Sequence, residues 1–97
     1  MNVISKRGLL QLASRHTDSL GPLLAWFQVA RRAVWEGLQD VREDFPTADQ
    51  VGNVLIFDIR GNRYRLVTRV NYAGRRIFVK DLLTHAEYDR RRWMKWV

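Results

Sequence analysis

Near its end the chain carries the stretch LLTHAEYD, in which His85 and Tyr88 stand three positions apart, just after an apolar segment that contains Lys80. Residues three apart on a helix lie on the same side of it. Together, an imidazole, a phenol and an ammonium group could serve the cleavage of RNA by its own 2′-hydroxyl. A base takes the proton of that hydroxyl, a cation stabilises the charged phosphorane, and an acid protonates the leaving 5′-oxygen. The stretch therefore raises the hypothesis of an RNA-cleaving site.

The same stretch also has a purely structural interpretation. Thr84 followed by Glu87 predicts a capping box at the start of a helix, with His85 as the first helical residue. Leu83 would then pack on Tyr88 as a hydrophobic staple. This interpretation accounts for Tyr88 but not for His85, so helix capping and catalysis both stay open at this point.

Positive charge is concentrated in the second half of the chain. Residues 1–49 hold six Lys or Arg and six Asp or Glu, whereas residues 50–97 hold eleven and four, so the second half carries the whole net charge of +7. Arg supplies 14 of the 17 cations, and its planar fork suits phosphate contacts and base stacking. This distribution predicts a polyanionic partner. A solvated, solubilising face is the alternative.

The hydrophobic pattern predicts an α+β fold. Residues 2–5 could form a short edge strand, residues 6–16 a helix with one apolar face, and a second helix begins near Pro22 and reaches Val34. Residues 37–50 predict a short helix or turn and then a loop. Three strands follow at residues 53–60, 63–72 and 75–83, and the capping box starts a C-terminal helix. The predicted architecture is N-terminal helices packed on one face of an antiparallel sheet, with a three-stranded meander at its centre.

Two short turns, Gly61-Asn62 and Ala73-Gly74, set the register of these three strands because both are plausible two-residue hairpin turns. The first predicts two cross-strand pairs on one face, Asp58–Arg65 and Ile56–Val67. The second predicts four, Asn71–Arg76, Arg69–Phe78, Val67–Lys80 and Arg65–Leu82.

Side chains alternate between the two faces of a strand, so these registers assign each residue to a face. One face is the core that the two helices should cover, and it carries Leu55, Phe57, Ile59, Tyr64, Leu66, Val70, Tyr72, Ile77, Val79 and Leu83. The opposite face, called the outer face below, carries Asp58, Arg60, Arg63, Arg65, Arg69, Asn71, Arg76, Phe78 and Lys80, with Val54, Ile56, Val67 and Leu82 among them. Its cations and its aromatic ring predict phosphate contacts and base stacking. A solvated face whose arginines pair with Asp58 and its neighbours is the alternative.

The composition excludes several other classes of protein. Without cysteine there is no disulfide framework and no thiolate chemistry. The two histidines, His16 and His85, lie in different segments, so we expect no metal site and no cofactor. No segment approaches the roughly 20 apolar residues of a membrane span, and the first residues lack the apolar centre of a signal peptide. We expect one soluble cytoplasmic domain over residues 1–97.

Three segments, DFPTAD, FDIRGNRYRL and LLTHAEYD, resemble in order and spacing the HigB toxins of type II toxin–antitoxin systems, part of the wider RelE-like group. The resemblance covers nearly the whole chain, and T-H-x-E-Y-D and G-N-x-Y-R-L are its most specific parts. It implies an mRNA interferase with a RelE-like α+β fold that enters the ribosomal A site and cleaves mRNA during translation. It also implies a HigA-type antitoxin with a helix-turn-helix domain. Operator DNA would be bound only through this antitoxin.

The resemblance also implies a set of catalytic residues. His85 and Tyr88 match the T-H-x-E-Y-D motif, Arg65 matches the arginine of Y-R-L, and Lys80 matches a basic position on the preceding strand. Which residue acts as acid and which as base stays open. The outer face adds six predicted RNA-binding residues, Arg60, Arg63, Arg69, Asn71, Arg76 and Phe78. A non-catalytic basic domain that binds RNA or an acidic protein is the alternative function.

Overall fold

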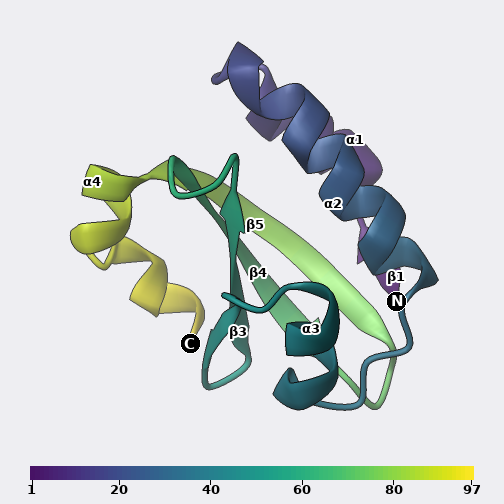
Figure 1. Ribbon diagram of the computed structural model, residues 1–97. Coiled ribbons are helices and arrows are strands. Elements are labelled where there is room, and N and C mark those ends of the chain that lie inside the picture. Colours follow the sequence, from purple (N-terminus) through teal and green to yellow (C-terminus); the bar gives the residue numbers. More distant parts are fainter.

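The helices and strands of the chain form separate layers. The computed structural model describes all residues 1–97. Its elements are β1 (Asn2–Ile4), α1 (Lys6–Ala13), the 3₁₀ helix η1 (Thr17–Ser19), α2 (Leu20–Arg32), α3 (Leu38–Asp44), β2 (Asp49–Val51), β3 (Val54–Ile59), β4 (Tyr64–Asn71), β5 (Arg76–Thr84), α4 (His85–Asp89) and the 3₁₀ helix η2 (Arg92–Trp96). Figure 1 shows α1 and α2 on one side of the sheet and α4 with the C-terminus on the other. The predicted α+β class is confirmed.

The sheet has five strands in the order β1-β5-β4-β3-β2. β1 runs parallel to β5, and the other pairs are antiparallel. The edge strand β1 and the three-stranded meander β3-β4-β5 were predicted. The strand at the other edge, β2, was expected to be part of a loop. Its three residues are too few to show an alternating pattern, and pairing with β3 is what makes them a strand.

Both predicted hairpin turns are present. Hydrogen bonds from the Arg63 N–H to the Arg60 carbonyl (3.2 Å) and from the Arg75 N–H to the Tyr72 carbonyl (3.1 Å) close them. Four of the predicted cross-strand pairs are confirmed, namely Asp58–Arg65, Ile56–Val67, Asn71–Arg76 and Arg69–Phe78.

The register between β4 and β5 changes midway along the strands. Thr68 pairs with Val79 while Val67 pairs with Asp81, so Lys80 is an extra residue in β5. The predicted pairs Val67–Lys80 and Arg65–Leu82 are therefore wrong. A bulge moves every later side chain to the opposite face. For this reason Leu82 lies in the main core, whereas Leu83, which we predicted there, packs on the outer face.

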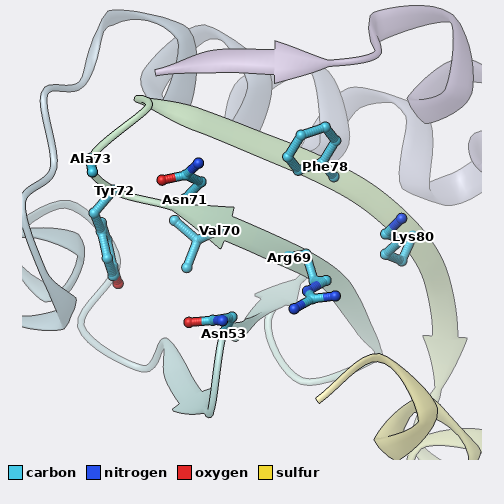
Figure 2. A pocket seen from close by; sticks show the side chains of 8 residues that line it. All are labelled: Asn53, Arg69, Val70, Asn71, Tyr72, Ala73, Phe78 and Lys80. Atoms are coloured by element: carbon cyan, nitrogen blue, oxygen red, sulfur yellow. The ribbon is translucent and has the colours of Figure 1, made fainter.

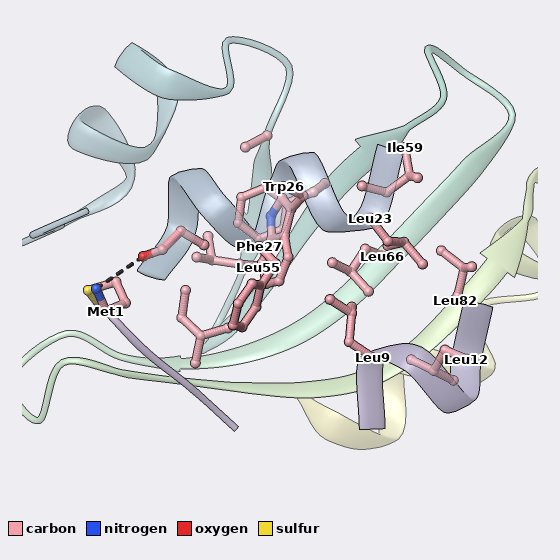
Figure 3. Packing of buried hydrophobic residues seen from close by; sticks show 14 of the residues in the cluster. Met1, Leu9, Leu12, Leu23, Trp26, Phe27, Leu55, Ile59, Leu66 and Leu82 are labelled. Carbon is pink, nitrogen blue, oxygen red and sulfur yellow. Dashed lines mark hydrogen bonds between the residues drawn. The ribbon is translucent and has the colours of Figure 1, made fainter. Parts of the chain in front are cut away.

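The main core lies between the helices and the sheet. Trp26 of α2 meets Phe57 of β3 edge to face, with ring centroids 5.3 Å apart, and Figure 3 shows Leu9, Leu23 and Trp26 directed at the sheet. The predicted core residues of the sheet other than Leu83 belong to this cluster or pack at its margin. The predicted second helix is shorter than expected, because α2 ends at Arg32 and Val34 is exposed.

The N-terminal residue closes one end of this core. Met1 is buried, and its amino group donates to the carbonyl of Ala30 at 3.1 Å and to that of Ala33, at the end of α2 (Figure 3). Burial lowers the pKa of this amino group. The contact holds β1 against the last turn of α2.

The outer face is covered along part of its length by the C-terminal segment. Val54, Ile56 and Val67 form a second, smaller core with Trp93 of η2, against which Leu83, Tyr88 and Trp96 pack. The three sheet residues were predicted on this face, but the tail RRRWMKWV was not predicted to cover them. The uncovered part of the outer face therefore lies towards the β4–β5 hairpin.

Candidate functional site

The start of α4 is fixed by the predicted capping box. The Glu87 N–H donates to Thr84 Oγ1 at 3.2 Å, and the Thr84 N–H donates to Glu87 Oε1 at 2.9 Å. The hydrogen bond from the Thr84 backbone lowers the pKa of the Glu87 carboxyl. A five-residue helix has little stability of its own, so the cap and the contacts of Tyr88 set its direction.

Tyr88 lies in a stack of three side chains. The Arg65 guanidinium lies 5.5 Å from the centre of its ring, and the Trp93 ring is parallel to it at a centroid distance of 5.2 Å. Trp93 also donates from Nε1 to the Tyr88 carbonyl at 3.0 Å. Burial, and then the nearby Asp49 carboxylate, raise the pKa of the Tyr88 phenol, so the hydroxyl is protonated at neutral pH. The role of Trp93 was missed by the sequence analysis, although an aromatic residue in such a basic tail was a visible sign.

Arg65 is held in place from several directions. Its Nε lies 3.0 Å from Asp58 Oδ1, as the predicted cross-strand pair requires, and its terminal nitrogens donate to the Asn62 carbonyl at 3.1 Å and to Asn62 Oδ1 at 2.6 Å. Only 13% of its side chain is exposed. The guanidinium is therefore an organised part of the Tyr88 stack rather than a free surface cation.

The other two predicted catalytic residues lie apart from this stack. His85 is the first residue of α4, is 61% exposed, and has its Nε2 3.7 Å from Asp89 Oδ2. Lys80 is the exposed bulge residue of β5, and its Nζ lies 5.8 Å from the centre of the Phe78 ring. The structure thus joins Arg65 with Tyr88 and Lys80 with Phe78.

A cavity of about 600 Å³ opens on the outer face near the β4–β5 hairpin. This outer-face cavity, shown in Figure 2, is lined by Asn53, Arg69, Val70, Asn71, Tyr72, Ala73, Phe78 and Lys80. Three of the predicted RNA-binding residues and one predicted catalytic residue are among them. Asn53, which belongs to the turn between β2 and β3, was not predicted.

The remaining predicted RNA-binding residues lie elsewhere. Arg60 and Arg63, at the β3–β4 turn, are 2.7 and 3.2 Å from Asp18 Oδ2. Asp18 also accepts a hydrogen bond from the Tyr64 hydroxyl at 2.6 Å, and this bond, followed by the two arginines, lowers its pKa. Arg76 is exposed at the start of β5, opposite Asn71. The structure therefore ties Arg60 and Arg63 to the helical layer.

No cluster of three or more His, Cys, Asp or Glu side chains is placed to hold a metal ion. None of the helices has both the length and the apolar character needed to cross a membrane.

Comparison with known proteins gives a consistent result. Residues 19–91 match the family HigB_toxin, the RelE-like toxic component of a toxin-antitoxin system. The chain is 27% identical over 93 residues to the mRNA interferase HigB of Escherichia coli O6:H1, a match covering 93% of this chain and 90% of that protein. It is 22% identical over 92 residues to the mRNA interferase toxin HigB of Escherichia coli K12, covering 92% and 88%. The family match includes Arg65, Lys80, His85 and Tyr88 and ends before Trp93.

Proposed function

Because this chain belongs to the HigB toxin family, the RelE-like toxic components of toxin-antitoxin systems, we propose that it is an endoribonuclease that cleaves translated mRNA on the ribosome. The relatives that it matches along nearly their whole length are named mRNA interferases. Such an activity stops translation and growth, and it acts in the cytoplasm, where translated mRNA is found.

The observation that carries the proposal is the organised position of Tyr88. Its ring is held between Arg65 and Trp93, on the sheet face that also carries the unpaired cations of the outer-face cavity. A tyrosine that serves only as the hydrophobic staple of a helix needs an apolar contact, but it does not need a guanidinium against its ring. The arrangement supports a role for the phenol beside a negatively charged phosphate.

The chemistry follows from the properties of each side chain. His85 is exposed to solvent and takes the proton of the ribose 2′-hydroxyl. The 2′-oxygen then bonds to the adjacent phosphorus, and Lys80 with Arg65 stabilises the charged phosphorane. As the bond to the 5′-oxygen breaks, the protonated Tyr88 hydroxyl supplies the proton that this oxygen takes up. The products are a 2′,3′-cyclic phosphate and a free 5′-hydroxyl. A side chain without a proton to donate cannot take the place of Tyr88 in this step.

The proposed reaction needs the ribosome because the protein alone does not bring its catalytic side chains together at one point. His85 contacts Asp89, while Lys80 lies over Phe78 on the sheet. In-line attack needs the reacting atoms about 3 to 3.5 Å apart and aligned. We propose that mRNA held in the A site is presented already bent, so that the protein has only to supply the reacting groups.

The RNA-binding part of the proposal rests on cations without a carboxylate partner. Arg69, Asn71, Arg76 and Phe78 contact the RNA, together with Lys80. Arg60 and Arg63 contribute less, because both are paired with Asp18, whose carboxylate offsets one of their two charges.

The experiment is cleavage of one defined mRNA by the purified protein, with and without programmed ribosomes, with the 5′ ends mapped. We expect cuts within the reading frame in the presence of ribosomes and little cutting of naked RNA. Equal rates on naked RNA would contradict ribosome dependence. RNA binding without any cleavage would instead favour the alternative, a non-catalytic basic domain.

A toxin-antitoxin system implies an antitoxin partner, and we propose a HigA-type helix-turn-helix protein through which alone operator DNA is bound. The net charge of +7 carried by residues 50–97 favours a partner that lays carboxylates over this half. Association should then be faster at low salt. A rate that is independent of ionic strength would contradict this description of the interface.

A further inference from the structure

The outer-face cavity lies at the opposite end of β5 from the proposed catalytic residues His85 and Tyr88, while Lys80, at the bulge midway along the strand, lines its near side. Phe78 precedes Thr84, the cap of α4, by six residues, which corresponds to about 20 Å along a strand. At about 600 Å³ the cavity is within the range of small-molecule sites, roughly 300 to 1,000 Å³. It is therefore large enough for a nucleotide, and Phe78 is too far from His85 and Tyr88 for a base stacked on it to belong to the bond that is cut.

The cavity has cations but no acids. Arg69 and Lys80 are exposed, neither belongs to an ion pair, and no Asp or Glu lines the cavity. By contrast, Arg60, Arg63 and Arg65 form ion pairs at the other end of the sheet. Two unpaired cations on a concave surface are suited to a phosphate group.

An aromatic ring lies next to these cations. Phe78 is half-buried on β5 and faces Arg69 across the strand pair. Figure 2 shows Phe78 on the same strand as Lys80, with Arg69 and Asn71 on the neighbouring strand. Tyr72, the other aromatic residue of the lining, is committed elsewhere, because its hydroxyl donates to Gln50 at 2.6 Å. Phe78 is thus the surface on which a planar base can stack.

Two amide side chains complete the cavity. Asn71 accepts a hydrogen bond from the Gly74 N–H at 2.9 Å through its Oδ1, which fixes the side chain and leaves its Nδ2 free to donate. Asn53 is exposed on the β2–β3 turn, and its amide can both donate and accept. Such groups read the edges of unpaired bases. A cavity that only attracted phosphate would need neither amide.

Resting on the proposed function, we infer that the outer-face cavity is a nucleobase subsite for single-stranded mRNA, a few nucleotides away from the cleaved bond. The base stacks on Phe78, its edge meets Asn53 and Asn71, and its phosphate lies against Arg69, which leaves Lys80 for the cleaved phosphate. The subsite sets the position of the mRNA on the protein, and it gives cleavage a sequence preference that the catalytic residues by themselves do not provide.

The first experiment measures binding without ribosomes and without cleavage. The side-chain amide signals of Asn53 and Asn71 are followed by NMR during titration with each of the four nucleoside 5′-monophosphates and with ribose 5-phosphate. We expect at least one nucleotide to bind roughly 5-fold or more tightly than ribose 5-phosphate, because the base adds stacking. Phe78→Leu should remove this difference, and Arg69→Gln should weaken both ligands alike. Arg7→Gln, an exposed cation on α1, is the charge-matched control and should change nothing.

The outcomes that overturn the inference are specific. Equal affinity for ribose 5-phosphate and for all four nucleotides would reduce the cavity to a phosphate site. An acidic peptide that shifts the Asn53 and Asn71 signals where nucleotides do not would make it a protein-docking site. Should Phe78→Leu fail to fold, Asn53→Ala replaces it, since Asn53 is exposed in a turn, and unchanged discrimination among the four nucleotides in that variant would also overturn the inference.

The second experiment separates this inference from the proposed nuclease activity. Cleavage positions across a cellular mRNA pool are compared for the parent protein and Phe78→Leu. We expect the variant to cut more slowly than the parent and with a weaker sequence preference. Persistence of the parent's preference would overturn the subsite and leave the nuclease intact. Nucleotide binding by a protein that never cleaves would support the subsite and overturn the nuclease.

Discussion

At the start of β4, Arg65 contacts Asp58, Asn62 and Tyr88, whereas near the end of the same strand Arg69 has no carboxylate partner and lines an open cavity. The two residues are of the same type on the same face of one strand, yet one is part of an organised stack and the other faces solvent. Side chains that take part in a reaction need a fixed geometry, while cations that track a flexible polyanion need accessibility. The difference supports the proposal that the outer face has a catalytic end around Arg65 and a binding end around Arg69, with Lys80 at the bulge between them.

The largest expected effect is at the catalytic end. His85→Ala should reduce ribosome-dependent cleavage by roughly 10²-fold or more if the imidazole is the base. Its side chain is exposed and the capping box does not use it, so the free energy of unfolding should change by no more than about 0.5 kcal/mol. Cleavage of a defined mRNA and thermal unfolding are measured together. If this variant cuts like the parent, the active site lies among Arg65, Lys80 and the other cations of the sheet.

Tyr88→Phe tests whether the stack supports chemistry or only structure. The ring remains between Arg65 and Trp93, so the melting curve should not move, while loss of the proton donor should reduce cleavage by about 10²-fold. Single-turnover cleavage on ribosomes is the measurement. Full activity in this variant would leave Tyr88 as no more than the apolar partner of Trp93 and Leu83.

Arg69→Gln tests the binding end. Each phosphate contact of single-stranded nucleic acid contributes about 0.7 to the slope of log affinity against log salt, so removing one should lower that slope by about this amount. Arg63→Gln is the matched comparison, and it should change the slope less, because Arg63 is already paired with Asp18. Fluorescence titration of a labelled oligoribonucleotide at several salt concentrations gives both slopes. Equal effects of the two substitutions would remove the distinction between paired and unpaired cations.

The catalytic end was the more predictable of the two. The capping box at Thr84 and Glu87 and the Asp58–Arg65 pair both follow from local sequence, because helix caps and two-residue turns impose fixed spacings. The family motif placed Tyr88 and Arg65 in one site, and the structure joins them. The tail marked Trp93 as unusual but did not show where it lies, because its place depends on how the tail folds back over Val54, Ile56 and Val67.

The binding end depended on information that the sequence does not display. The bulge at Lys80 reverses the faces of Leu82 and Leu83, and since both residues are leucine, neither position reveals it. The one sign in the sequence is Asp81, a charged residue that unbroken alternation would have placed on the core face. The pairing of Arg60 and Arg63 with Asp18 joins residues more than 40 positions apart. Counting charges along the strands therefore gave the outer face more free cations than it has.

Thr84→Ala separates the fold of the catalytic end from its chemistry. Removing the cap should lower the free energy of unfolding by about 1 kcal/mol, because the Glu87 N–H loses its acceptor. Cleavage by the folded protein should stay close to the parent value, since every reacting group persists. Chemical denaturation and cleavage below the unfolding transition are the two measurements. If Thr84→Ala reduced cleavage as much as His85→Ala does, the cap itself would position the reacting groups.

The last substitution, Asp18→Asn, releases Arg60 and Arg63 from their common partner. The Tyr64 hydroxyl and the two arginines hold the pKa of Asp18 below its usual 3.8. A carboxyl whose pKa is lower in the folded state stabilises the fold above the unfolded value, and that stabilisation is lost as the pH falls through the lowered pKa. The variant should therefore be slightly less stable than the parent at neutral pH, and the difference should shrink below about pH 4.

At the same time the two released arginines should raise the salt slope of RNA binding by up to about 1.4, the contribution of two phosphates. Denaturation at pH 7 and pH 3, with the oligoribonucleotide titration at neutral pH, gives both quantities. The variant could instead lose the same stability at both pH values and keep the salt slope of the parent. That result would show that pairing with Asp18 is not what separates the arginines of the β3–β4 turn from those of the outer-face cavity.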